Sequence, residues 1–261
     1  MNRHNHDGVV FYRFRILEEF PEVVHGAFTR LGGVSAPPFA TLNLGHTVGD
    51  APEAVDENHR RVCRALDVAP SDLVSPHQVH GARVVRVTHA ERGRVLPATD
   101  ALITDQPGVA LLLRFADCLP ILVYDPTHRA VGLAHAGWRG TVAGVARATV
   151  AAMQEAFGSH PEDLVVGLGP AIGPCCYEVG PEVVRAVRAV LPKADGVFIP
   201  QPGGGVHLNL PEANRRQLVA AGVRHIEVAP LCTACNTGEW FSHRAEGGRT
   251  GRFGVAVVLK C

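Results

Sequence analysis

Cys118 and His135 are the residues of this chain whose types and spacing point most directly to chemistry. They flank two apolar runs, one ending at Tyr124 and the next beginning at Ala130, with an Asp-Pro turn sequence between them. This arrangement predicts a β-hairpin. Pairing Tyr124 with Ala130 across the turn, or shifting this register by about one residue, brings Cys118 and His135 to the same end of the hairpin. Opposed Cβ atoms lie about 4.5–5.5 Å apart, so a thiolate and an imidazole there could share one metal ion or one proton.

A glycine-rich segment follows His135 and leads into a predicted helix. Gly137 and Gly140 would let the backbone approach a ligand, and the first turn of a helix offers free N–H groups. Arg139 lies between the glycines, so the segment suits an anion beside Cys118 and His135. A strand-to-helix turn that merely exposes Arg139 is the alternative, and the residues alone leave both interpretations open.

The other cysteines form a less specific pattern. The chain has seven cysteines, an odd number without the spacing of a disulfide framework, so we interpret them as thiols. Cys175 and Cys176 are adjacent, a spacing at which two side chains do not easily chelate one ion, so they are predicted to pack as thiols. Cys232 and Cys235 form a C-x-x-C, but no second C-x-x-C completes a structural zinc site. A packed loop is predicted there in preference to a redox role.

Length and composition narrow the possible folds and partners. The chain has 261 residues, of which 46% are hydrophobic, and no linker or repeat divides it, so one domain spanning residues 1–261 is expected. The formal net charge is +0 and no basic run occurs, which argues against nucleic-acid or acidic-membrane partners. The N-terminus lacks a signal-peptide apolar region, and no apolar run is long enough to span a bilayer, so a cytoplasmic location is expected.

Apolar periodicity predicts the elements that must position these side chains. Strands are predicted at residues 9–14, 23–28, 82–87, 101–104, 109–115, 119–124, 130–134, 164–168, 226–228 and 253–259. Helices are predicted at residues 52–68, 142–157, 182–190 and 211–221, the first with Asp50 in its start signal. The expected fold class is mixed α/β (α+β), with mixed β-sheets packed against helices.

Ordered motifs along nearly the whole chain resemble those of one protein family. The chain contains TRLGGVS, LNLG, VGD, HQVHG, ADCLP, HAGWRG, GPAIGPCCYEVG, a Cys-Thr pair and SHR…TGR, in that order. This set is similar to the YfiH-like family, whose members were once labelled multicopper polyphenol oxidases or laccase-domain proteins. The resemblance implies a single mixed α/β domain related to the cysteine-hydrolase-like fold of deamidating toxins.

The resemblance also implies an activity. It points to a zinc-dependent purine nucleoside phosphorylase that converts adenosine, inosine and S-methyl-5'-thioadenosine into free base and ribose 1-phosphate, with adenosine deaminase activity beside it. Purine nucleosides and phosphate would be the partners. One zinc ion per chain would be held by His80 of HQVHG together with Cys118 and His135, which leaves the open fourth position of a catalytic site. Copper is the less favoured metal.

The same motifs imply roles for further residues. The catalytic candidates are Asp117, Cys118 and Arg139. The implied substrate contacts are Arg30, Asn43, Arg60, Trp138, Arg244 and Arg252. The implied phosphate contacts are Gly137, Arg139, Gly140 and Thr141. Strand alternation would point Asp117 away from Cys118, which fits a residue that only orients a neighbour or caps a turn. Proton transfer and substrate contact are the functional alternatives. Relatives usually have Asn-Arg where this chain has Asn58-His59-Arg60, so either Arg60 takes over that contact or the contact is altered.

Three other functions compete with this one. A copper-dependent, laccase-like polyphenol oxidase needs paired His-x-His motifs, and only His4-Asn5-His6 has that form. A cysteine hydrolase or deamidase would use Cys118 as a nucleophile with a histidine base, chemistry that metal binding would block. A metal-sensing or partner-binding module would leave the glycines and arginines around the site without a purpose.

Overall fold

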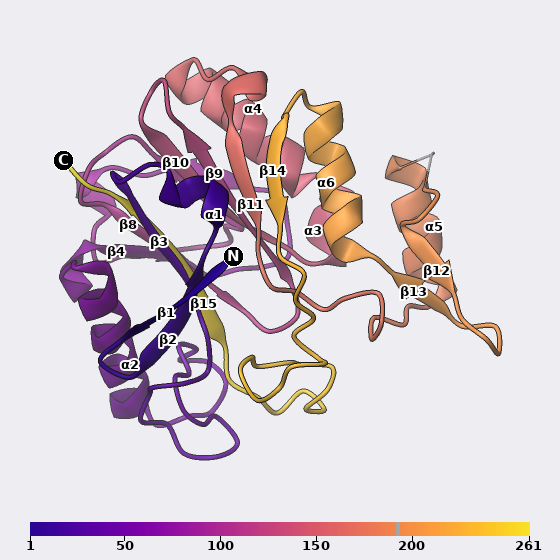
Figure 1. Ribbon diagram of the computed structural model, residues 1–261, viewed down its shortest axis with the longest axis horizontal. Helices are drawn as coiled ribbons and strands as arrows, with labels where there is room; N and C mark the ends of the chain where they lie inside the picture. The colour runs from indigo at the N-terminus through magenta and orange to yellow at the C-terminus, as the bar shows by residue number, and fades with distance from the viewer. Residues whose placement is uncertain (192–193) are drawn as a thin grey trace.

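Two large β-sheets form the centre of the molecule (Figure 1). The computed structural model describes residues 1–191 and 194–261. The seven-stranded sheet has the order β1-β2-β3-β15-β8-β4-β6, the six-stranded sheet has the order β14-β11-β9-β10-β7-β5, and β12 pairs with β13. The strands are β1 (Asn2–His6), β2 (Val9–Arg13), β3 (Val23–Phe28), β4 (Leu73–Pro76), β5 (Val84–Arg86), β6 (Val95–Leu96), β7 (Ala101–Thr104), β8 (Ala110–Phe115), β9 (Leu119–Asp125), β10 (Ala130–Ala136), β11 (Val165–Leu168), β12 (Phe198–Pro200), β13 (Val206–Leu208), β14 (His225–Val228) and β15 (Phe253–Leu259). The helices are α1 (Arg15–Glu18), α2 (Pro52–Leu66), α3 (Trp138–Ala143), α4 (Val145–Phe157), α5 (Pro181–Val190) and α6 (Leu210–Ala220), with short 3₁₀ turns at Pro70–Asp72, His89–Glu91 and Pro161–Asp163.

Helices cover the outer faces of both sheets, which gives four layers and confirms the mixed α/β class (Figure 1). α2 packs on the seven-stranded sheet, whereas α3, α4, α5 and α6 share a core with the six-stranded sheet. The strands between these layers are apolar on both faces. In β15, Val255 and Val257 face the other sheet, and Ala256 and Val258 face α2. Burial on both faces explains why these strands appear in the sequence as unbroken apolar runs.

β9 and β10 form the predicted hairpin, in a register one residue away from the predicted one. Asp125, and not Tyr124, pairs with Ala130. The Asp125 carboxylate accepts two amide hydrogens inside the turn, at 2.9 and 3.0 Å, so this residue both closes the turn and ends the strand. The shift leaves Cys118 and His135 at the same end of the hairpin, as predicted.

The segment after β10 forms two helices where one was predicted. α3 begins at Trp138, directly after Gly137, and α4 begins at Val145. Gly144 separates them with a φ of 82°, a left-handed value that glycine adopts without the steric cost of a side chain. Gly158 ends α4, as predicted.

Other departures from the predicted elements lie in short or exposed strands and at helix ends. β1, β4 and β6 were not predicted: β1 is mostly polar and exposed, and β4 and β6 have only four and two residues, too few to produce a recognisable apolar pattern. Asp50 does not cap α2. Its carboxylate bonds the amide of Ala51 and the side chain of Asn43, and the helix begins at Pro52.

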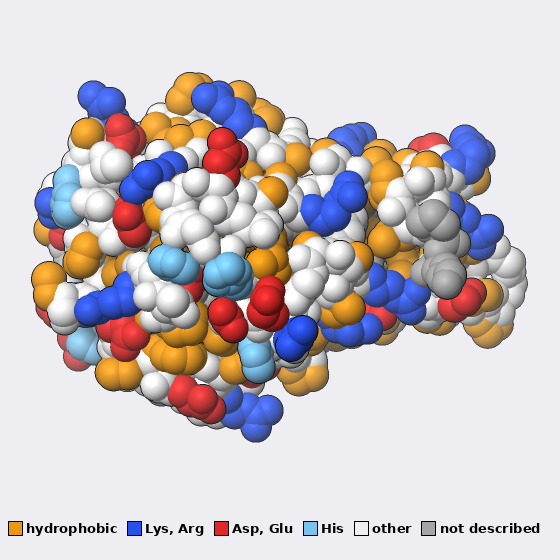
Figure 2. All heavy atoms as spheres, turned by 90° about the horizontal axis from the view of Figure 1, so that it is seen from above, with side chains coloured by type: hydrophobic (Ala, Val, Ile, Leu, Met, Phe, Trp, Pro, Cys, Tyr) orange, Lys and Arg blue, Asp and Glu red, His pale blue; other side chains and the backbone are white. Residues whose placement is uncertain are grey.

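The surface has no single dominant sign of charge on the face that Figure 2 shows. Blue and red side chains both occur across this face, in keeping with the formal net charge of +0. Within the described ranges, none of the helices combines the length and the apolarity that crossing a bilayer requires.

Candidate active site

Segments from both sheets converge at one end of the strands. β4 runs parallel to β8, so residues 77–80 leave β4 at the end where residues 116–118 leave β8. Residues 116–118 connect β8 in one sheet to β9 in the other. Two strands, β10 and β11, are antiparallel to β9, so both end beside the start of β9. β15 is antiparallel to β8, so Arg252, the residue before it, also lies at this end. The topology alone gathers the candidate residues in one place.

His80, Cys118 and His135 form a group that could hold a metal ion. Their ligand atoms all lie within 4.8 Å of one another, and the two imidazole rings meet edge to face with centroids 4.8 Å apart. His135 is buried, Cys118 is half-buried and His80 is exposed. The group is therefore anchored in the interior on one side and accessible on the other.

Asp100, which no sequence motif indicated, bonds the side chain of one of these three residues and the backbone of another. Its Oδ1 lies 3.0 Å from Nδ1 of His135, and both residues are buried. The same carboxylate accepts the amide hydrogens of Val79, His80 and Gly81 at 3.2, 2.9 and 2.7 Å. Burial opposes the charged form of Asp100, but His135 and these amides hold its pKa below its ordinary value. The bond to Nδ1 leaves the other ring nitrogen of His135 for a ligand, as carboxylates do around metal-binding histidines.

Cys118 and His135 stabilise each other's charged forms. Burial alone would raise the pKa of the Cys118 thiol, but the charge of His135 and hydrogen bonds from both histidines outweigh burial and lower the pKa to about 6. Burial would likewise lower the pKa of His135, but the Cys118 charge and the Asp100 carboxylate raise it to about 9. Between these values the pair is a thiolate and an imidazolium, and the thiolate is the form that binds metals and attacks electrophiles.

The backbone of the HAGWRG segment packs directly against the group. A Cβ atom at Gly137 would lie 3.0 Å from Sγ of Cys118 and 3.0 Å from Cδ2 of His80, so only glycine fits there without displacing a ligand. A Cβ atom at Gly140 would lie 3.2 Å from the carbonyl oxygen of Gly81. Gly140 is thus placed to pack against the loop that carries His80.

Asp117 is buried beside Cys118 and connects three segments of the chain. Its backbone is left-handed, with a φ of 82°. Its carboxylate accepts the hydroxyl hydrogen of Thr233 at 2.6 Å and the amide hydrogen of Arg244 at 2.7 Å. Its carbonyl oxygen accepts the amide hydrogen of Ile172 at 2.9 Å. Asp117 therefore holds together the walls of the cavity that lies next to Cys118.

This cavity has a volume of about 770 Å³ and contains all three residues of the His-Cys-His group in its wall. Its size is typical of small-molecule sites, which measure about 300–1,000 Å³. The positive residues that line it are Arg114, Arg139, Arg244 and Arg252, and the carboxylate among the described residues of its wall is Asp117. Its larger apolar and aromatic residues are Trp138, Ile172, Tyr177 and Leu210. The charges favour an anion, and the flat apolar walls favour a ring system.

Several residues predicted to contact substrate or phosphate line this cavity, namely Gly137, Trp138, Arg139, Arg244 and Arg252. The exposed guanidinium of Arg139 lies over the Trp138 ring, 4.4 Å from its centroid. That of Arg244 lies over the Tyr177 ring at 5.3 Å. The Arg252 guanidinium donates to the two preceding carbonyl oxygens, so part of its hydrogen-bonding capacity is already used.

Two predicted substrate contacts lie elsewhere. Arg60 is exposed on α2 and pairs with Glu57 of the same helix at 2.8 Å, so the structure does not place it at the cavity. Arg30 is half-buried, pairs with Glu246 at 3.0 Å and donates to two carbonyl oxygens. The Arg30 guanidinium therefore connects two loops, and its donors are not free to bind a substrate.

Asn43 and Thr141 are buried and act through the backbone of other residues. Oδ1 of Asn43 accepts the amide hydrogens of Gly45 and Arg252, both of which line the cavity, at 3.0 and 2.8 Å. Thr141 donates its amide and hydroxyl hydrogens to the carbonyl oxygen of Gly137 at 2.8 and 3.0 Å. Because both donors are used, the predicted phosphate contact by Thr141 does not fit its position.

Gln78 and Arg114 are further site residues, and the motifs did not predict either. Nε2 of Gln78 donates to the Arg114 carbonyl oxygen at 2.8 Å, and Oε1 accepts the Arg114 amide hydrogen at 3.0 Å. The Gln78 side chain makes the two hydrogen bonds to the Arg114 backbone that a neighbouring strand would make, and so fixes the loop before His80 against β8. The position of Gln78 inside HQVHG is the one signal that the sequence offers for this role.

Cys175, Cys176, Cys232 and Cys235 also form a group, with sulfur atoms within 4.8 Å of one another. Packing thiols were predicted at the adjacent pair and a packed loop at the C-x-x-C, and no sequence signal linked the two pairs; the structure brings them together. Cys175 and Cys235 are 60 residues apart in the sequence, so the contact depends on the fold and not on local spacing.

Known proteins share this sequence and this fold over most of the chain. A purine nucleoside phosphorylase named YlmD from Geobacillus stearothermophilus is 44% identical over 243 residues, which cover 89% of each protein. The purine nucleoside phosphorylase YfiH from Escherichia coli is 40% identical over 231 residues, 88% of this chain and 91% of that protein. The crystal structure of YlmD from Geobacillus stearothermophilus matches with a TM-score of 0.93 at 40% identity, over 99% of this chain and 98% of that one.

A sequence family described as multi-copper polyphenol oxidoreductase laccase matches residues 24–260. The relatives named YlmD and YfiH cover 89% and 88% of the chain. The relationship to deamidating toxins stays a prediction. The chain therefore belongs to the multi-copper polyphenol oxidoreductase laccase family, together with the YfiH-like proteins that it resembles.

Proposed function

We propose that this protein is a zinc-dependent purine nucleoside phosphorylase. Its substrates would be adenosine, inosine and S-methyl-5'-thioadenosine, and its products the free base and ribose 1-phosphate. The main support for the proposal is that the His-Cys-His group lies in the wall of a cavity of about 770 Å³, which four arginines also line. The names of the relatives support it, since both YlmD and YfiH are called purine nucleoside phosphorylases.

The donor set of His80, Cys118 and His135 fits a zinc ion. Two imidazoles and a thiolate are ligands that zinc accepts, and three protein ligands with an open fourth position are typical of a catalytic zinc site. The lowered pKa of Cys118, about 6, supplies the thiolate at neutral pH. When bound, the ion would supply Lewis acidity at the edge of the cavity.

Arg139 and Arg244 are proposed to bind phosphate. Both are exposed at the cavity, and a guanidinium group offers parallel N–H donors that match a phosphate oxygen pair. Contact with Trp138 limits the orientations of Arg139, and the bond of the Arg244 amide to Asp117 fixes the backbone of Arg244. Phosphate held there, next to the Gly137 backbone, would face the C1′ atom of a ribose in the same cavity.

Tyr177 and Trp138 are proposed to contact the purine. Their rings offer flat apolar surface, and the purine would stack or pack against it. Burial, together with the nearby charge of Cys118, raises the pKa of Tyr177 to about 12, so its hydroxyl keeps its proton and can donate to a purine nitrogen. A protonated or hydrogen-bonded base leaves the ribose more easily, because less negative charge develops on it.

We propose adenosine deamination as a second reaction of the same cavity. A purine held for phosphorolysis would place its ring near the same His-Cys-His group. Deamination replaces the amino group of the purine with a water oxygen and releases ammonia, so a proton must pass from the water to the departing amino group. Asp117 stays the candidate carrier of this proton because it lines the cavity beside Cys118. The two reactions differ in their need for phosphate, which makes them separable by experiment.

A cysteine hydrolase is a second candidate, which one observation favours. The site has the arrangement of a catalytic triad: the Cys118 thiol would be the nucleophile, His135 the base, and Asp100 the carboxylate that orients His135. The pKa of the Cys118 thiol is lowered, as a nucleophile requires. A metal ion on Cys118 would block this chemistry. Removal of the metal should therefore abolish phosphorolysis, whereas a cysteine hydrolase would stay active or gain activity.

A copper-dependent polyphenol oxidase has less support, although the family description names one. The lone His-x-His sequence, residues 4–6, lies in β1. His4 bonds Glu18 at 2.9 Å and stacks on Phe11. No residue of β1 is among those described in the cavity wall, so the copper cluster of a laccase has no counterpart there.

Product analysis tests the proposed function. Zinc-loaded protein is incubated with adenosine, with and without phosphate, beside a Cys118→Ala variant and a Cys261→Ser variant that removes an exposed thiol elsewhere. Adenine and ribose 1-phosphate should form only with phosphate and only when Cys118 is present. Inosine in both buffers would demonstrate deamination. Intact adenosine in every sample would reject the nucleoside assignment.

A further inference from the structure

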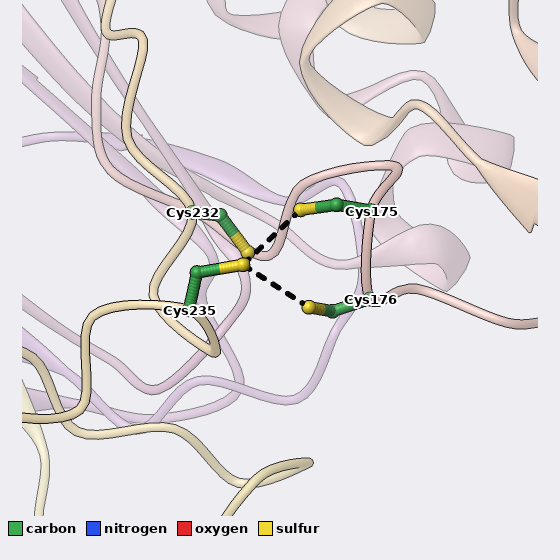
Figure 3. A group of neighbouring side chains, drawn as sticks. All are labelled: Cys175, Cys176, Cys232 and Cys235. Carbon is green, nitrogen blue, oxygen red and sulfur yellow. Dashed lines mark hydrogen bonds between the residues drawn. The ribbon is translucent and has the colours of Figure 1, made fainter.

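Four cysteines from two distant loops meet next to the proposed active site, with their sulfur atoms directed toward one another (Figure 3). Cys175 and Cys176 lie between β11 and α5, and Cys232 and Cys235 follow β14. The sulfur of Cys235 lies 3.4 Å from that of Cys175 and 3.3 Å from that of Cys176. Cys175 and Cys235 are exposed and the other two are half-buried, so a metal ion could enter from solvent.

We propose that these four side chains bind a second zinc ion, as thiolates in a structural site separate from the first. In a tetrahedral site with Zn–S bonds of about 2.3 Å, the sulfur atoms lie about 3.8 Å apart. The sulfur separations here are 3.3 and 3.4 Å for two pairs and at most 4.8 Å for the others, which brackets this value. Four thiolates fill every position of the ion, so the site is closed to substrate.

The local backbone explains how adjacent cysteines can share one ion. The amides of Cys176 and Tyr177 both donate to the carbonyl oxygen of Gly173 at 3.0 Å, which curls the loop into a turn. This turn lets Cys175 and Cys176 project toward a common point. The amide of Gly173 also donates to the sulfur of Cys232 at 3.2 Å, a bond that stabilises a thiolate.

Backbone contacts already set the two loops side by side. Ala171 and Cys232 form a parallel bridge, and the Thr233 amide donates to the Ala171 carbonyl oxygen at 3.0 Å. The Asn236 side chain donates to the Cys232 carbonyl oxygen at 2.8 Å. The sulfur positions are therefore preorganised by groups other than the cysteines themselves.

The second ion would stabilise one wall of the active-site cavity. Ile172 and Tyr177 flank the adjacent cysteines and line the cavity. Thr233 lies inside the C-x-x-C and donates its hydroxyl hydrogen to Asp117 at 2.6 Å. A zinc ion here would hold Tyr177 and Asp117 in place without touching substrate.

Oxidation of the cysteines to disulfides is the competing outcome. A disulfide needs a sulfur separation of about 2.05 Å between two partners. Cys235 instead lies nearly equidistant from Cys175 and Cys176, at 3.4 and 3.3 Å. These nearly equal distances fit four sulfur ligands around one metal ion better than they fit a disulfide between Cys235 and one partner.

Elemental analysis of variants tests the proposal. The protein as isolated under reducing conditions should contain one zinc ion more than a Cys175→Ser/Cys235→Ser double variant. A His80→Ala/His135→Ala variant, which disrupts the first site, should keep the cysteine-bound ion, and Co²⁺ in its place should give the charge-transfer absorption of a four-thiolate site. Cys261→Ser removes an exposed thiol outside the group and should leave the zinc content unchanged.

Alkylation of the unsubstituted protein tests the proposal even if the double variant does not fold. With zinc bound, Cys175 and Cys235 should resist alkylation despite their exposure, and a chelator should make them reactive. Alkylation at the same rate with and without the chelator would overturn the proposal. So would a mass that shows disulfides, iron in place of zinc, or equal zinc in the double variant and the unsubstituted protein.

Discussion

Oδ1 of Asp100 lies 3.0 Å from Nδ1 of His135, and the same carboxylate accepts the amide hydrogen of His80 at 2.9 Å. One buried side chain thus sets the positions of two proposed metal ligands, one in β10 and the other in the loop that follows β4. Carboxylates in this position around metal sites typically contribute about 10–100-fold to metal affinity or activity. The precision of the site therefore depends on a residue that is not itself a proposed ligand.

An Asp100→Asn variant should bind zinc about 10–100-fold more weakly, because the amide cannot favour the correct His135 tautomer as a carboxylate does. Competition with a chromophoric chelator measures this affinity. Asp105→Asn is the matched control, since Asp105 pairs with Arg86 away from the cavity. Equal zinc affinity in the Asp100 variant and the unsubstituted protein would contradict the positioning role.

A Gly137→Ala variant should lose zinc affinity and activity, at least about tenfold, while remaining folded. The new Cβ would lie 3.0 Å from both Cys118 and His80 and would push at least one of them away. Gly238→Ala is the control, because a Cβ there meets nothing within 4 Å. Zinc titration together with thermal unfolding separates displacement of the ligands from a general loss of stability, and unchanged zinc affinity would count against the placement of these side chains.

Alkylation of Cys118 in metal-free protein should follow a pKa of about 6. The rate should rise as the pH increases through this value, because deprotonation produces the reactive thiolate, whereas an ordinary thiol titrates near about 8.5. Mass spectrometry of the peptide that contains Cys118 reports this rate apart from the other thiols. A His135→Ala variant should move the midpoint to higher pH. A midpoint near that of an ordinary thiol in the unsubstituted protein would rule out the ion pair.

An Arg139→Met variant should raise the KM for phosphate about tenfold or more and leave the zinc content unchanged, because a charge-assisted contact contributes about 1.5–3 kcal/mol. Arg60→Met should leave the kinetic constants unchanged, since Arg60 pairs with Glu57 on the outside of α2. Phosphate titration of both variants makes the comparison. A phosphate KM that changes in the Arg60 variant and not in the Arg139 variant would reverse the assignment of the two arginines.

Local patterns in the sequence were sufficient to predict the centre of this fold. The turn before Ala130 and the apolar runs around it predicted the hairpin, and the same hairpin brings Cys118 and His135 together. The one-residue error in register arose because Asp125 serves both the turn and the strand, which an apolar pattern does not show.

Contacts between distant segments account for what the sequence did not predict. Asp100 is a single acidic residue before a short strand, and no spacing connects it to His135. Cys175 and Cys235 are brought together by two loops that no local pattern relates. Arg60 follows the family motif only approximately, and the turn of α2 carries it to the solvent side of the helix.

The sugar product of adenosine cleavage by the zinc-loaded protein distinguishes phosphorolysis from hydrolysis most directly. We expect ribose 1-phosphate in a one-to-one ratio with adenine, a rate that increases with phosphate concentration, and loss of both products when a chelator removes the metal. Adenine accompanied by free ribose, or cleavage that continues at the same rate without phosphate or without the metal, would contradict the proposed function.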